Sequence, residues 1–474
     1  MTRETPEVCI VGGGPAGATL ARQLALAGHD VCLLERSPFP RHRLGESLAA
    51  GILQVLEALG LREAVEQAPF FQRANSFLRW PEPLEAPVPA GEEPFGYVVD
   101  RGEFDQFLLK EARAAGVRVL QPVAARRASR LPSRGWLLQV EQEGVEGEVA
   151  TRFLVDASGR RCWLPGGKLR HGVRTGALYG YWRLPAPERQ VPLCTYVEAG
   201  QDEWFWGGLL PDRRFGAMVF VDPARYREAS PDALYRRLLG TSSLRECMRG
   251  ELLGVVRATD ASAYVAGELA DEVSLRVGEA AFAVDPLSAQ GVHLAMLSAI
   301  QAAAVIHTLL RAPGHSAAAL EFYRTHLEEM SSLHGRLARE HHGHVQQFRA
   351  RPFWKARGPL PSDRPPLRRA IAVSGISADT RLWPAPGGRI LKVPCLLGEW
   401  IESREALTAP TLERPVSYLG GVELVPLLRL LKGGEPVSQI LRLWTSRVGQ
   451  ETGVQVLAWV LRQGVLVPRP EHAA

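Results

Sequence analysis

The sequence is short of lysine and cysteine, and both shortages limit the chemistry open to it. Five of its 56 lysine and arginine residues are lysines, so a reaction that needs a lysine amine has few candidates. Six cysteines are scattered without a Cys-x-x-Cys pair, which argues against structural zinc and for a reducing compartment. Cys9 and Cys32 fall within apolar strand patterns, where a cysteine acts as a small buried hydrophobe.

The sequence also lacks a long apolar run, a signal peptide and concentrated charge of one sign. No apolar run approaches the roughly 20 residues that a membrane span needs. Acidic residues precede the first strand, where a signal peptide would carry its apolar segment. A surplus of +5 spread over 56 basic and 51 acidic residues is no signature of nucleic-acid binding. These absences predict a cytoplasmic protein without a membrane or nucleic-acid partner.

A strand, a glycine-rich turn, a helix and a second strand follow one another near the start. The segment 7–36 reads EVCIVGGGPAGATLARQLALAGHDVCLLER. Its apolar pattern predicts strands at 8–11 and 31–34 and a helix at 16–27. The turn has Gly-x-Gly-x-x-Gly spacing, in which the glycines make a tight turn, admit a pyrophosphate and let helix and strand pack closely. The predicted contacts with a dinucleotide are Gly12, Gly14, Pro15, Ala16, Gly17, Glu35 and Arg36.

Two of these contacts concern the adenosine end. Glu35 closes the second strand, where a carboxylate can accept hydrogen bonds from a ribose. Arg36 follows it, and the alternative for this side chain is simple solvation. The fingerprint alone does not decide which dinucleotide binds.

A second cluster of turn-forming residues precedes an apolar helix late in the chain. Residues 278–293 read GEAAFAVDPLSAQGVH, and the next segment predicts a buried helix whose first turn lies near Gln290. A helix N-terminus presents unpaired N–H groups, and Gly291 lets a ligand approach them. The alternative is an ordinary loop before a core helix.

Four motifs in this order resemble the flavin-binding fold of aromatic hydroxylases, flavin-dependent halogenases and geranylgeranyl-type reductases. They are RHRLGES at 41–47 before a predicted long helix at 48–59, YVVDRGEFDQFLLKEARAAGV at 97–117, FLVDASGR at 153–160, and the segment from 278. The resemblance covers about residues 5–350. It implies FAD, held by residues matching the family's contacts: Arg43, Glu46, Ser47, Arg101, Val123, Asp156, Gly159, Gly278, Glu279, Pro286, Gly291 and Val292.

One of these positions departs from the family pattern. Glu279 stands where the family has an aspartate that binds the ribityl chain, so the carboxylate is kept on a longer side chain. The resemblance also implies that amides near Gly291 and Val292 face the N1/C2=O edge of the ring. A helix start there favours the anionic reduced flavin by about 0.3 to 2 kcal/mol.

Between the cofactor motifs, four segments predict an antiparallel sheet that the family uses as the floor of its substrate pocket. They lie at 179–184, 194–198, 203–210 and 215–221. Alternation places Trp204 and Trp206 on one face. They either line the pocket or simply fill the core.

The halogenase signature is incomplete. Halogenases have a Trp-x-Trp-x-Ile-Pro pattern. This sequence does not match it, because two further residues separate Trp206 from Leu210-Pro211. Halogenases also use a pocket lysine, but residues 61–100 contain none, and the nearest candidates are Gln72 and Arg73. An arginine, cationic at any working pH, does not replace that amine. Halogenation is therefore an alternative, as is a geranylgeranyl-type reduction.

The combined motifs resemble flavin monooxygenases that hydroxylate a tryptophan side chain in a partner polypeptide during cysteine tryptophylquinone biogenesis. This resemblance implies attack of an indole on a flavin C4a-hydroperoxide formed from reduced FAD and O2. Electrons would come from NAD(P)H directly or through a separate flavin reductase. The candidate catalytic residues are Gln290 and Trp206, together with Glu46, whose alternative role is cofactor binding.

The predicted fold is α/β (α+β), with 474 residues forming two or three domains. A Rossmann-type FAD-binding domain spans 1–170 and 255–350, with an antiparallel-sheet substrate domain inserted at 171–254. A linker at 351–374 leads to a small, mainly helical domain at 375–474. Its apolar segments at 422–431, 437–444, 454–461 and 465–467 suit a winged-helix-like unit.

The function of this last domain stays open from the sequence. We expect it to cap the flavin pocket or dock a protein substrate. A flavin-bound regulatory protein that binds nucleic acid is the alternative, but the region lacks a concentrated basic face. His341 and His344 share a helix face near the domain boundary, yet no second ligand set accompanies them, so no metal site is predicted.

Overall fold

The structure is a computed structural model that describes residues 5–41, 43–80, 96–185, 194–363 and 375–468. The chain divides into two compact units. The main unit holds residues 1–307 and 323–361, and the C-terminal unit holds residues 308–322 and 362–474. Each unit has its own apolar core, and each is described separately.

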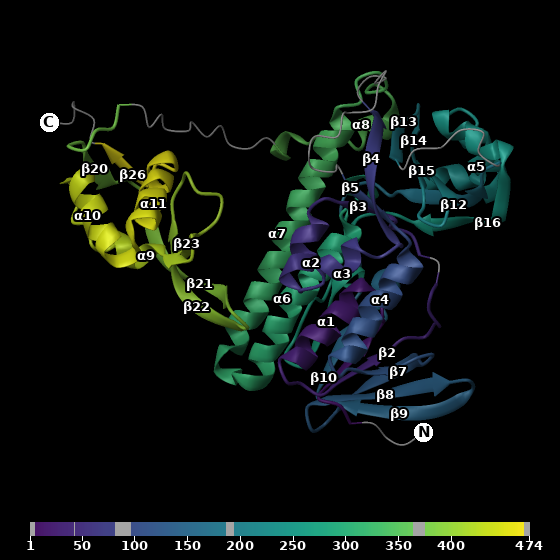
Figure 1. Cartoon of the computed structure of the whole chain (residues 1–474), viewed down its shortest axis with the longest axis horizontal. Helices are drawn as coiled ribbons and strands as arrows, with labels where there is room; N and C mark the ends of the chain where they lie inside the picture. The colour runs from purple at the N-terminus through teal and green to yellow at the C-terminus, as the bar shows by residue number, and fades with distance from the viewer. Residues whose placement is uncertain (1–4, 42, 81–95, 186–193, 364–374, 469–474) are drawn as a thin grey trace. The chain divides into compact units, whose positions relative to one another are not determined.

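A five-stranded parallel sheet forms the centre of the main unit (Figure 1). Its order is β18-β10-β1-β2-β6, and its strands span Ser274–Arg276, Phe153–Asp156, Val8–Val11, Val31–Leu34 and Arg118–Leu120. Parallel neighbours need a crossover, and α1 (Pro15–Leu26) supplies the one from β1 to β2. The two predicted strands are confirmed, and the predicted helix is observed one residue earlier at each end.

A meander of three antiparallel strands packs beside this sheet, and the sequence analysis did not anticipate it. Its strands β7, β8 and β9 span Ala124–Leu131, Gly135–Gln142 and Val145–Thr151. Trp136 and Leu138 join an apolar cluster with Cys9 and Cys32 of the parallel sheet. The two cysteines lie opposite each other on β1 and β2 as free thiols, in the buried role expected of them.

An eight-stranded sheet completes the main unit. Its order is β16-β12-β15-β14-β13-β4-β5-β3, with strands at Glu251–Asp260, Gly176–Arg183, Arg214–Val221, Glu203–Leu209, Cys194–Ala199, Phe71–Arg79, Gly96–Val99 and Ser47–Ala49. The four predicted strands are therefore present. Three strands, β3, β4 and β5, and part of β16 lie outside residues 171–254, so the sheet extends beyond the segment predicted to form it. Helix α5 (Pro231–Leu239) packs into an apolar cluster on one face of the sheet.

The predicted long helix at 48–59 is wrong in its first turn. Ser47–Ala49 is instead the edge strand β3, paired with β5. The helix α2 begins only at Ile52 and ends at Ala58. Tertiary pairing with β5 thus overrides the helical pattern of this apolar stretch.

Helices α6 (Gly291–Arg311) and α7 (Ser316–Gly343) follow the flavin motif in the sequence. Within the described residues, α6 is long and apolar enough to cross a membrane, with a mean hydropathy of 1.6, contrary to the sequence expectation. However, 78% of that apolar window is buried inside the structure. Such burial is typical of a core helix.

The remaining helices and strands of the main unit are α3 (Arg62–Glu66), α4 (Arg101–Ala114), α8 (Pro352–Lys355), and the sheet of β11 (Lys168–Arg170), β17 (Tyr264–Ala266) and β19 (Phe282–Ala283).

The C-terminal unit combines three helices with a three-stranded sheet, a long hairpin and the short pair of β23 (Tyr418–Leu419) and β24 (Val422–Glu423). The helices α9, α10 and α11 span Leu424–Leu428, Val437–Val448 and Gln450–Arg462. The sheet has the order β25-β20-β26, at Glu435–Pro436, Arg381–Pro384 and Leu466–Pro468. The hairpin of β21 (Arg389–Leu397) and β22 (Trp400–Thr408) was not anticipated. The amide of Ile401 on this hairpin donates to Thr308 Oγ1 at 2.9 Å.

Gly278 offers a direct test of how tightly the main unit is packed. It has a φ of +60°, and an added Cβ would lie 2.6 Å from Ala16 Cβ. Gly278→Ala should therefore lose about 2 to 5 kcal/mol of stability, from left-handed strain plus overpacking. Gly172 has a φ of +77° but no atom within 4 Å, so Gly172→Ala should lose only about 1 to 2 kcal/mol. Urea unfolding measures both, and equal losses would contradict the packing argument.

Candidate functional site

The first glycine turn brings β1, α1 and β10 closer together than any side chain permits. Gly12 has a φ of +114°, and a Cβ there would lie 2.4 Å from the carbonyl oxygen of Ala157. A Cβ on Gly17 would lie 1.9 Å from the Gly12 oxygen. Gly14 is the N-cap of α1, and the atom nearest to its missing Cβ is Arg41 Nη2 at 3.8 Å. The start of α1, with Pro15 as its first residue, is therefore backed by close packing and open on the side of Gly14.

Glu35 and Arg41 form a buried ion pair beside this turn. Glu35 Oε2 accepts from the Gly13 amide at 2.8 Å, while Oε1 accepts from Ser37 N at 2.8 Å and from Arg41 Nη1 at 3.1 Å. The Arg41 side chain is 14% exposed, and its buried Nε has no hydrogen-bond partner among the described residues. Burial lowers the pKa of Arg41, and the Glu35 charge opposes this. Arg36, by contrast, is exposed.

These features fit the pyrophosphate of a dinucleotide. A desolvated guanidinium with an unpaired Nε lies next to Gly14, where the amides of a helix start already favour an anion. Glu35 holds the glycine turn through Gly13, in addition to the ribose role predicted for it. The sequence analysis included Arg41 in the RHRLGES motif but did not name it as a cofactor contact.

The late motif meets the glycine turn at Gly278. Besides its approach to Ala16, the missing Cβ of Gly278 would lie 3.4 Å from Ala295 Cβ, and the Gly278 amide donates to Ser298 Oγ at 3.2 Å. The starts of α1 and α6 are therefore held against one short turn. Ala16 and Gly278 therefore lie next to each other, although they were predicted as cofactor contacts from the first and the last of the matching motifs.

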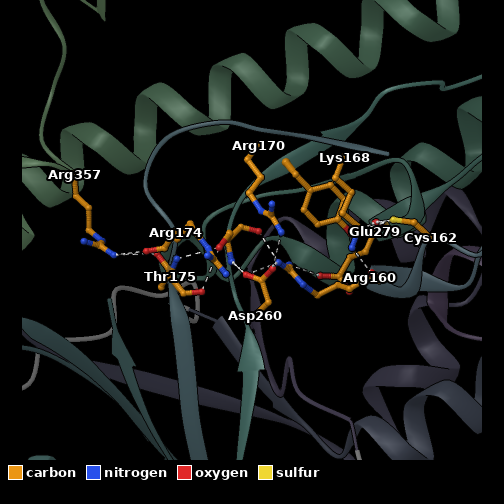
Figure 2. Close-up of polar contacts among 11 residues, drawn as sticks. Arg160, Cys162, Lys168, Arg170, Arg174, Thr175, Asp260, Glu279 and Arg357 are labelled. Atoms are coloured by element: carbon orange, nitrogen blue, oxygen red, sulfur yellow. Dashed lines mark hydrogen bonds and ion pairs between the residues drawn. The ribbon is translucent and has the colours of Figure 1, made fainter. Parts of the chain in front are cut away.

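Glu279 belongs to a polar cluster that the sequence analysis did not foresee (Figure 2). Its Oε1 lies 3.3 Å from Arg160 Nη1, and its backbone oxygen accepts from Tyr264 at 2.5 Å. Cys162 Sγ lies 3.6 Å from the Tyr264 hydroxyl. The Glu279 side chain is 42% exposed, so it can still reach a ligand, while Gly159 lies nearby with its missing Cβ 3.9 Å from Glu279 Oε2. The longer carboxylate is held in place by Arg160.

A second part of the site joins the 43–47 loop to the start of α6. Arg101 Nη1 donates to the Leu44 oxygen at 2.5 Å and its Nε lies 3.0 Å from Asp105 Oδ1. A Cβ on Gly45 would lie 2.6 Å from Arg101 Nη1 and 3.7 Å from Val292 Cγ2. Arg101 therefore fixes this loop against the helix start. Predicted contacts at the two ends of this surface, Arg43 and Gly291, face open space: Arg43 is exposed, and a Cβ on Gly291 would meet no atom within 4 Å.

Two predicted cofactor contacts use their polar groups within the protein. The Val123 amide donates to the Glu35 oxygen at 2.8 Å, so this amide is not free for an adenine. Asp156 is fully buried and accepts from the amides of Ser158 and Leu164 at 3.0 and 2.8 Å. Both residues therefore shape the loops around the groove. A direct contact with the nucleotide through these groups would need a rearrangement.

The loop before α6 is held by hydrogen bonds that begin at Asp285. This residue caps the short turn that starts at Pro286, accepting from Leu287 N at 3.0 Å, and its other oxygen lies 3.1 Å from His342 Nε2. Burial raises the pKa of Asp285, but the hydrogen bond and charge of His342 outweigh it and leave the pKa lowered. Gln290 is turned back onto its own helix, with Oε1 2.5 Å from His293 Nδ1. Gln290 is therefore engaged, which counts against its predicted role at the ring.

The eight-stranded sheet turns one face, here called the aromatic face, toward these loops. Trp204 and Trp206 both lie on it, as predicted, in one apolar cluster with Leu44 and Leu287 from the two loops. Trp204 stacks on Phe220 at 3.7 Å and is 2% exposed, which makes it a core residue. Trp206 is also buried, at 8% exposed, but its ring lies over Gly208 and Gly216, so it stays a candidate for the pocket.

Glu46 is buried beside the aromatic face and bound to a tyrosine that the sequence analysis missed. Its carboxylate accepts from the Tyr181 hydroxyl and from the Gly45 amide, the latter at 2.8 Å. Glu46 is 3% exposed. Burial raises its pKa, although Tyr181, Gly45 and the charge of Arg101 act in the opposite direction. This desolvated carboxylate therefore lies in the interior, whereas Arg43 on the same loop is exposed.

Strand register decides which residue stands where a halogenase would need its lysine. Gln72 pairs with Val98, which pairs with Ser47, so these three side chains share the aromatic face. Arg73 points to the opposite face, where it lines a cavity of about 790 Å³ together with Phe71, Tyr97 and three glutamates. The aromatic face therefore offers an amide rather than a basic side chain at this position.

The histidine-rich end of α7 forms no metal site in the part of the chain that the structure describes. No group of three or more His, Cys, Asp or Glu side chains there could hold an ion. The His341 and His344 rings lie 5.9 Å apart, while His342 binds Asp285.

Comparison with known proteins gives relatives for this arrangement. A family described as an FAD binding domain matches residues 5–165. A tryptophan 2-halogenase from Chondromyces crocatus is 30% identical over 345 residues, which are 67% of this chain and 64% of that protein. The chain thus spans less than two thirds of that relative.

Two solved structures match over a larger share of their own length. A peptidyl tryptophan dihydroxylase, QhpG, described as essential for tryptophylquinone cofactor biogenesis, is 28% identical with a TM-score of 0.73, covering 97% of this chain and 99% of that one. The myxobacterial chondrochloren halogenase CndH, described as a variant of FAD-dependent halogenases, is 30% identical with a TM-score of 0.66, covering 76% of this chain and 87% of that one.

The role of Arg41 can be tested by flavin titration. Arg41→Gln should raise the Kd for FAD about 10- to 100-fold, because a charge-assisted hydrogen bond contributes about 1.5 to 3 kcal/mol. Arg36→Gln is the matched control and should stay within about twofold, since that side chain is exposed. Quenching of FAD fluorescence measures both values. Equal Kd values for the two variants would exclude the assignment.

The burial of Glu46 predicts a pH-dependent stability. Because its pKa is raised in the folded state, Glu46 stabilises the protein most below its unfolded pKa of about 4.3, and this stability is lost as the pH rises through the folded pKa. Glu46→Gln cannot ionise, so its stability relative to wild type should increase with pH over that window. Urea unfolding from about pH 4 to pH 8 measures this, with exposed Glu103→Gln as control. A difference that does not change with pH would refute the argument.

Proposed function

This chain belongs to the superfamily of FAD-dependent monooxygenases and halogenases, and from that premise we propose that it is a monooxygenase acting on an indole-type aromatic group. We propose further that the indole is a tryptophan side chain of a polypeptide, modified during maturation of a tryptophylquinone cofactor. The likeness to the peptidyl tryptophan dihydroxylase over 97% of this chain supports this choice.

The single observation that carries the choice of hydroxylation is the composition of the aromatic face. It presents the Trp206 indole and, in place of a lysine, the uncharged amide of Gln72. None of the eight strands contains a lysine. An amide cannot form the haloamine-like species for which halogenases use their lysine amine.

The chain's own residues account for cofactor binding. The helix start at Gly14 and the Arg41 guanidinium would hold the pyrophosphate, and Glu35 the ribose. Glu279, fixed by Arg160, would meet the ribityl chain. FAD, once bound and reduced, supplies the chemistry that activates O2, and its electrons would come from NAD(P)H directly or through a separate reductase.

The protein's part in the reaction is to position the substrate and to exclude water. The loops that carry Leu44 and Leu287 pack into the same apolar cluster as Trp206, so an aromatic ring placed there would lie in a dry environment. The open helix start at Gly291 would face the flavin ring and favour negative charge on it. Positioning the substrate and excluding water require no acidic or basic side chain next to the flavin.

Halogenation is the second candidate, favoured by the 30% identity to a tryptophan 2-halogenase. The two reactions differ in the atom added to the substrate. The FAD-loaded protein is therefore incubated with an electron donor, O2, chloride or bromide, and N-acetyltryptophan amide or tryptophan-containing peptides.

Mass spectrometry should show products heavier by oxygen, whether or not halide is present. A control without electron donor should leave the substrate unchanged. Halogenated products that disappear when halide is omitted would overturn the proposal in favour of the second candidate. Incorporation of label from ¹⁸O2 would establish O2 as the source of the added oxygen.

A further inference from the structure

A row of small and hydroxyl-bearing residues crosses the aromatic face from β12 to β4. Tyr181 pairs with Gly216, Gly216 with Gly208, and Gly208 with Thr195. Thr195 pairs in turn with Ser76, and their hydroxyl oxygens lie 2.7 Å apart. Two adjacent strands thus carry no side chain in the middle of the row.

Trp206 and Tyr181 occupy the space next to these glycines. A Cβ on Gly208 would lie 3.2 Å from the Trp206 ring, and a Cβ on Gly216 would lie 3.3 Å from the same ring and 3.6 Å from the ring of Tyr181. The indole of Trp206 therefore lies flat across both glycines, with the Tyr181 ring beside it. Any side chain at either glycine would displace the indole.

Tyr181 connects this part of the face to the buried carboxylate. Its hydroxyl donates to Glu46 Oε1, and Glu46 Oε2 accepts from the Gly45 amide at 2.8 Å. Glu46 is 3% exposed whereas Tyr181 is only partly buried. A group that approaches over Trp206 thus meets the tyrosine first and the carboxylate behind it.

We propose, resting on the function proposed above, that Tyr181 is a catalytic residue. Its hydroxyl oxygen accepts a hydrogen bond from the ring N–H of an indole-type substrate, then takes that proton while its own proton passes to Glu46. A phenol oxygen accepts hydrogen bonds while its O–H donates one, so both contacts can exist together. The site would therefore select an aromatic ring whose edge carries an N–H donor.

The proton transfer balances without any further reactant. The oxygen, supplied from O2 by the chemistry of the proposed function, would reach the indole ring as a hydroxyl group as its O–O bond breaks. The electron pair of that bond leaves with the other oxygen, so positive charge develops on the ring and makes its N–H acidic. The substrate N–H bond breaks as a new O–H bond forms on Tyr181. The original Tyr181 O–H bond breaks as an O–H bond forms on Glu46 Oε1, so the tyrosine ends neutral and the carboxylate protonated.

The charges around the pair are compatible with this order of events. Burial raises the pKa of Glu46, which makes its carboxylate a better base, while Arg101 on α4 opposes the shift. Burial and the Glu46 charge both raise the pKa of Tyr181, so the phenol stays neutral until the substrate proton arrives. Arg214 on β15 lies 5.3 Å from the centre of the Tyr181 ring and is paired with Asp100 at 3.1 Å.

The test compares N-acetyltryptophan amide with its 1-methyl analogue, which lacks the ring N–H. In the FAD-loaded wild type, methylation should lower kcat/KM at least tenfold. Tyr181→Phe keeps the ring but should lose about 100-fold in kcat with the unmethylated probe, and it should treat the two probes alike. Tyr196→Phe is the matched control and should behave as wild type, because its ring packs in the apolar cluster on the opposite face of the sheet.

Two further measurements separate catalysis from structure. Calorimetry should show that wild type binds the N–H probe more tightly than the methylated one, with or without FAD, and that Tyr181→Phe loses this preference. Tyr181→Phe should still bind FAD with a Kd within about threefold of wild type, while its unfolding midpoint should fall because the buried Glu46 carboxylate loses a hydrogen bond. In wild type, kcat should rise with pH through the Glu46 pKa, and this rise should be absent in Glu46→Gln.

The outcomes distinguish this inference from the function on which it rests. If wild type oxygenates both probes equally and Tyr181→Phe keeps its rate, the inference is overturned while the proposed function stands. If no probe gains oxygen, the proposed function fails together with the catalytic step. Calorimetry then decides whether Tyr181 recognises the N–H group. Equal affinity for both probes would overturn this recognition role as well.

Discussion

The whole candidate site depends on three backbone segments approaching more closely than side chains allow. Gly12 lies against Ala157, Gly17 against Gly12, and Gly278 against Ala16, each at a distance that a Cβ would make impossible. This packing places the starts of α1 and α6 beside the same turn. We propose that one ligand spans the two helix starts, with its phosphate group at the Gly14 end and its electron-accepting ring at the Gly291 end.

The same use of missing side chains recurs on the eight-stranded sheet. Gly208 and Gly216 let the Trp206 indole lie flat, while Tyr181 beside it is bound to the buried Glu46. Leu44 and Leu287, on loops that carry predicted cofactor contacts, also pack into the apolar cluster around Trp206. Under the proposed function these loops border both the cofactor and the substrate, so a change in the 43–47 loop should affect both.

The sequence predicted those parts of the fold that local pattern determines. The strands at 8–11 and 31–34 and the helix between them follow from apolar runs and glycine spacing, and the structure confirms them. The FAD-type fold follows from the resemblance of four motifs to a known family, and the relatives confirm it. The helix predicted from residue 48 was wrong at Ser47–Ala49, because the pairing of this segment with β5 is a tertiary contact. The meander β7 to β9 was not anticipated at all. The Arg41–Glu35, Tyr181–Glu46 and Gln290–His293 contacts depend on side-chain rotamers, which no spacing rule reveals. The bond from the Val123 amide to the Glu35 backbone oxygen joins two distant segments. The cofactor contacts themselves stay predictions.

The central claim is that one flavin dinucleotide joins the Gly14 turn to the Gly291 helix start. A crystal structure of the protein with FAD tests it most directly. The account predicts the pyrophosphate within hydrogen-bond distance of the Gly14 helix start and of Arg41, and the ring beside Gly291 on the side of the aromatic face. Density for the flavin elsewhere, or a ring separated from Gly291 by the 43–47 loop, would contradict the account.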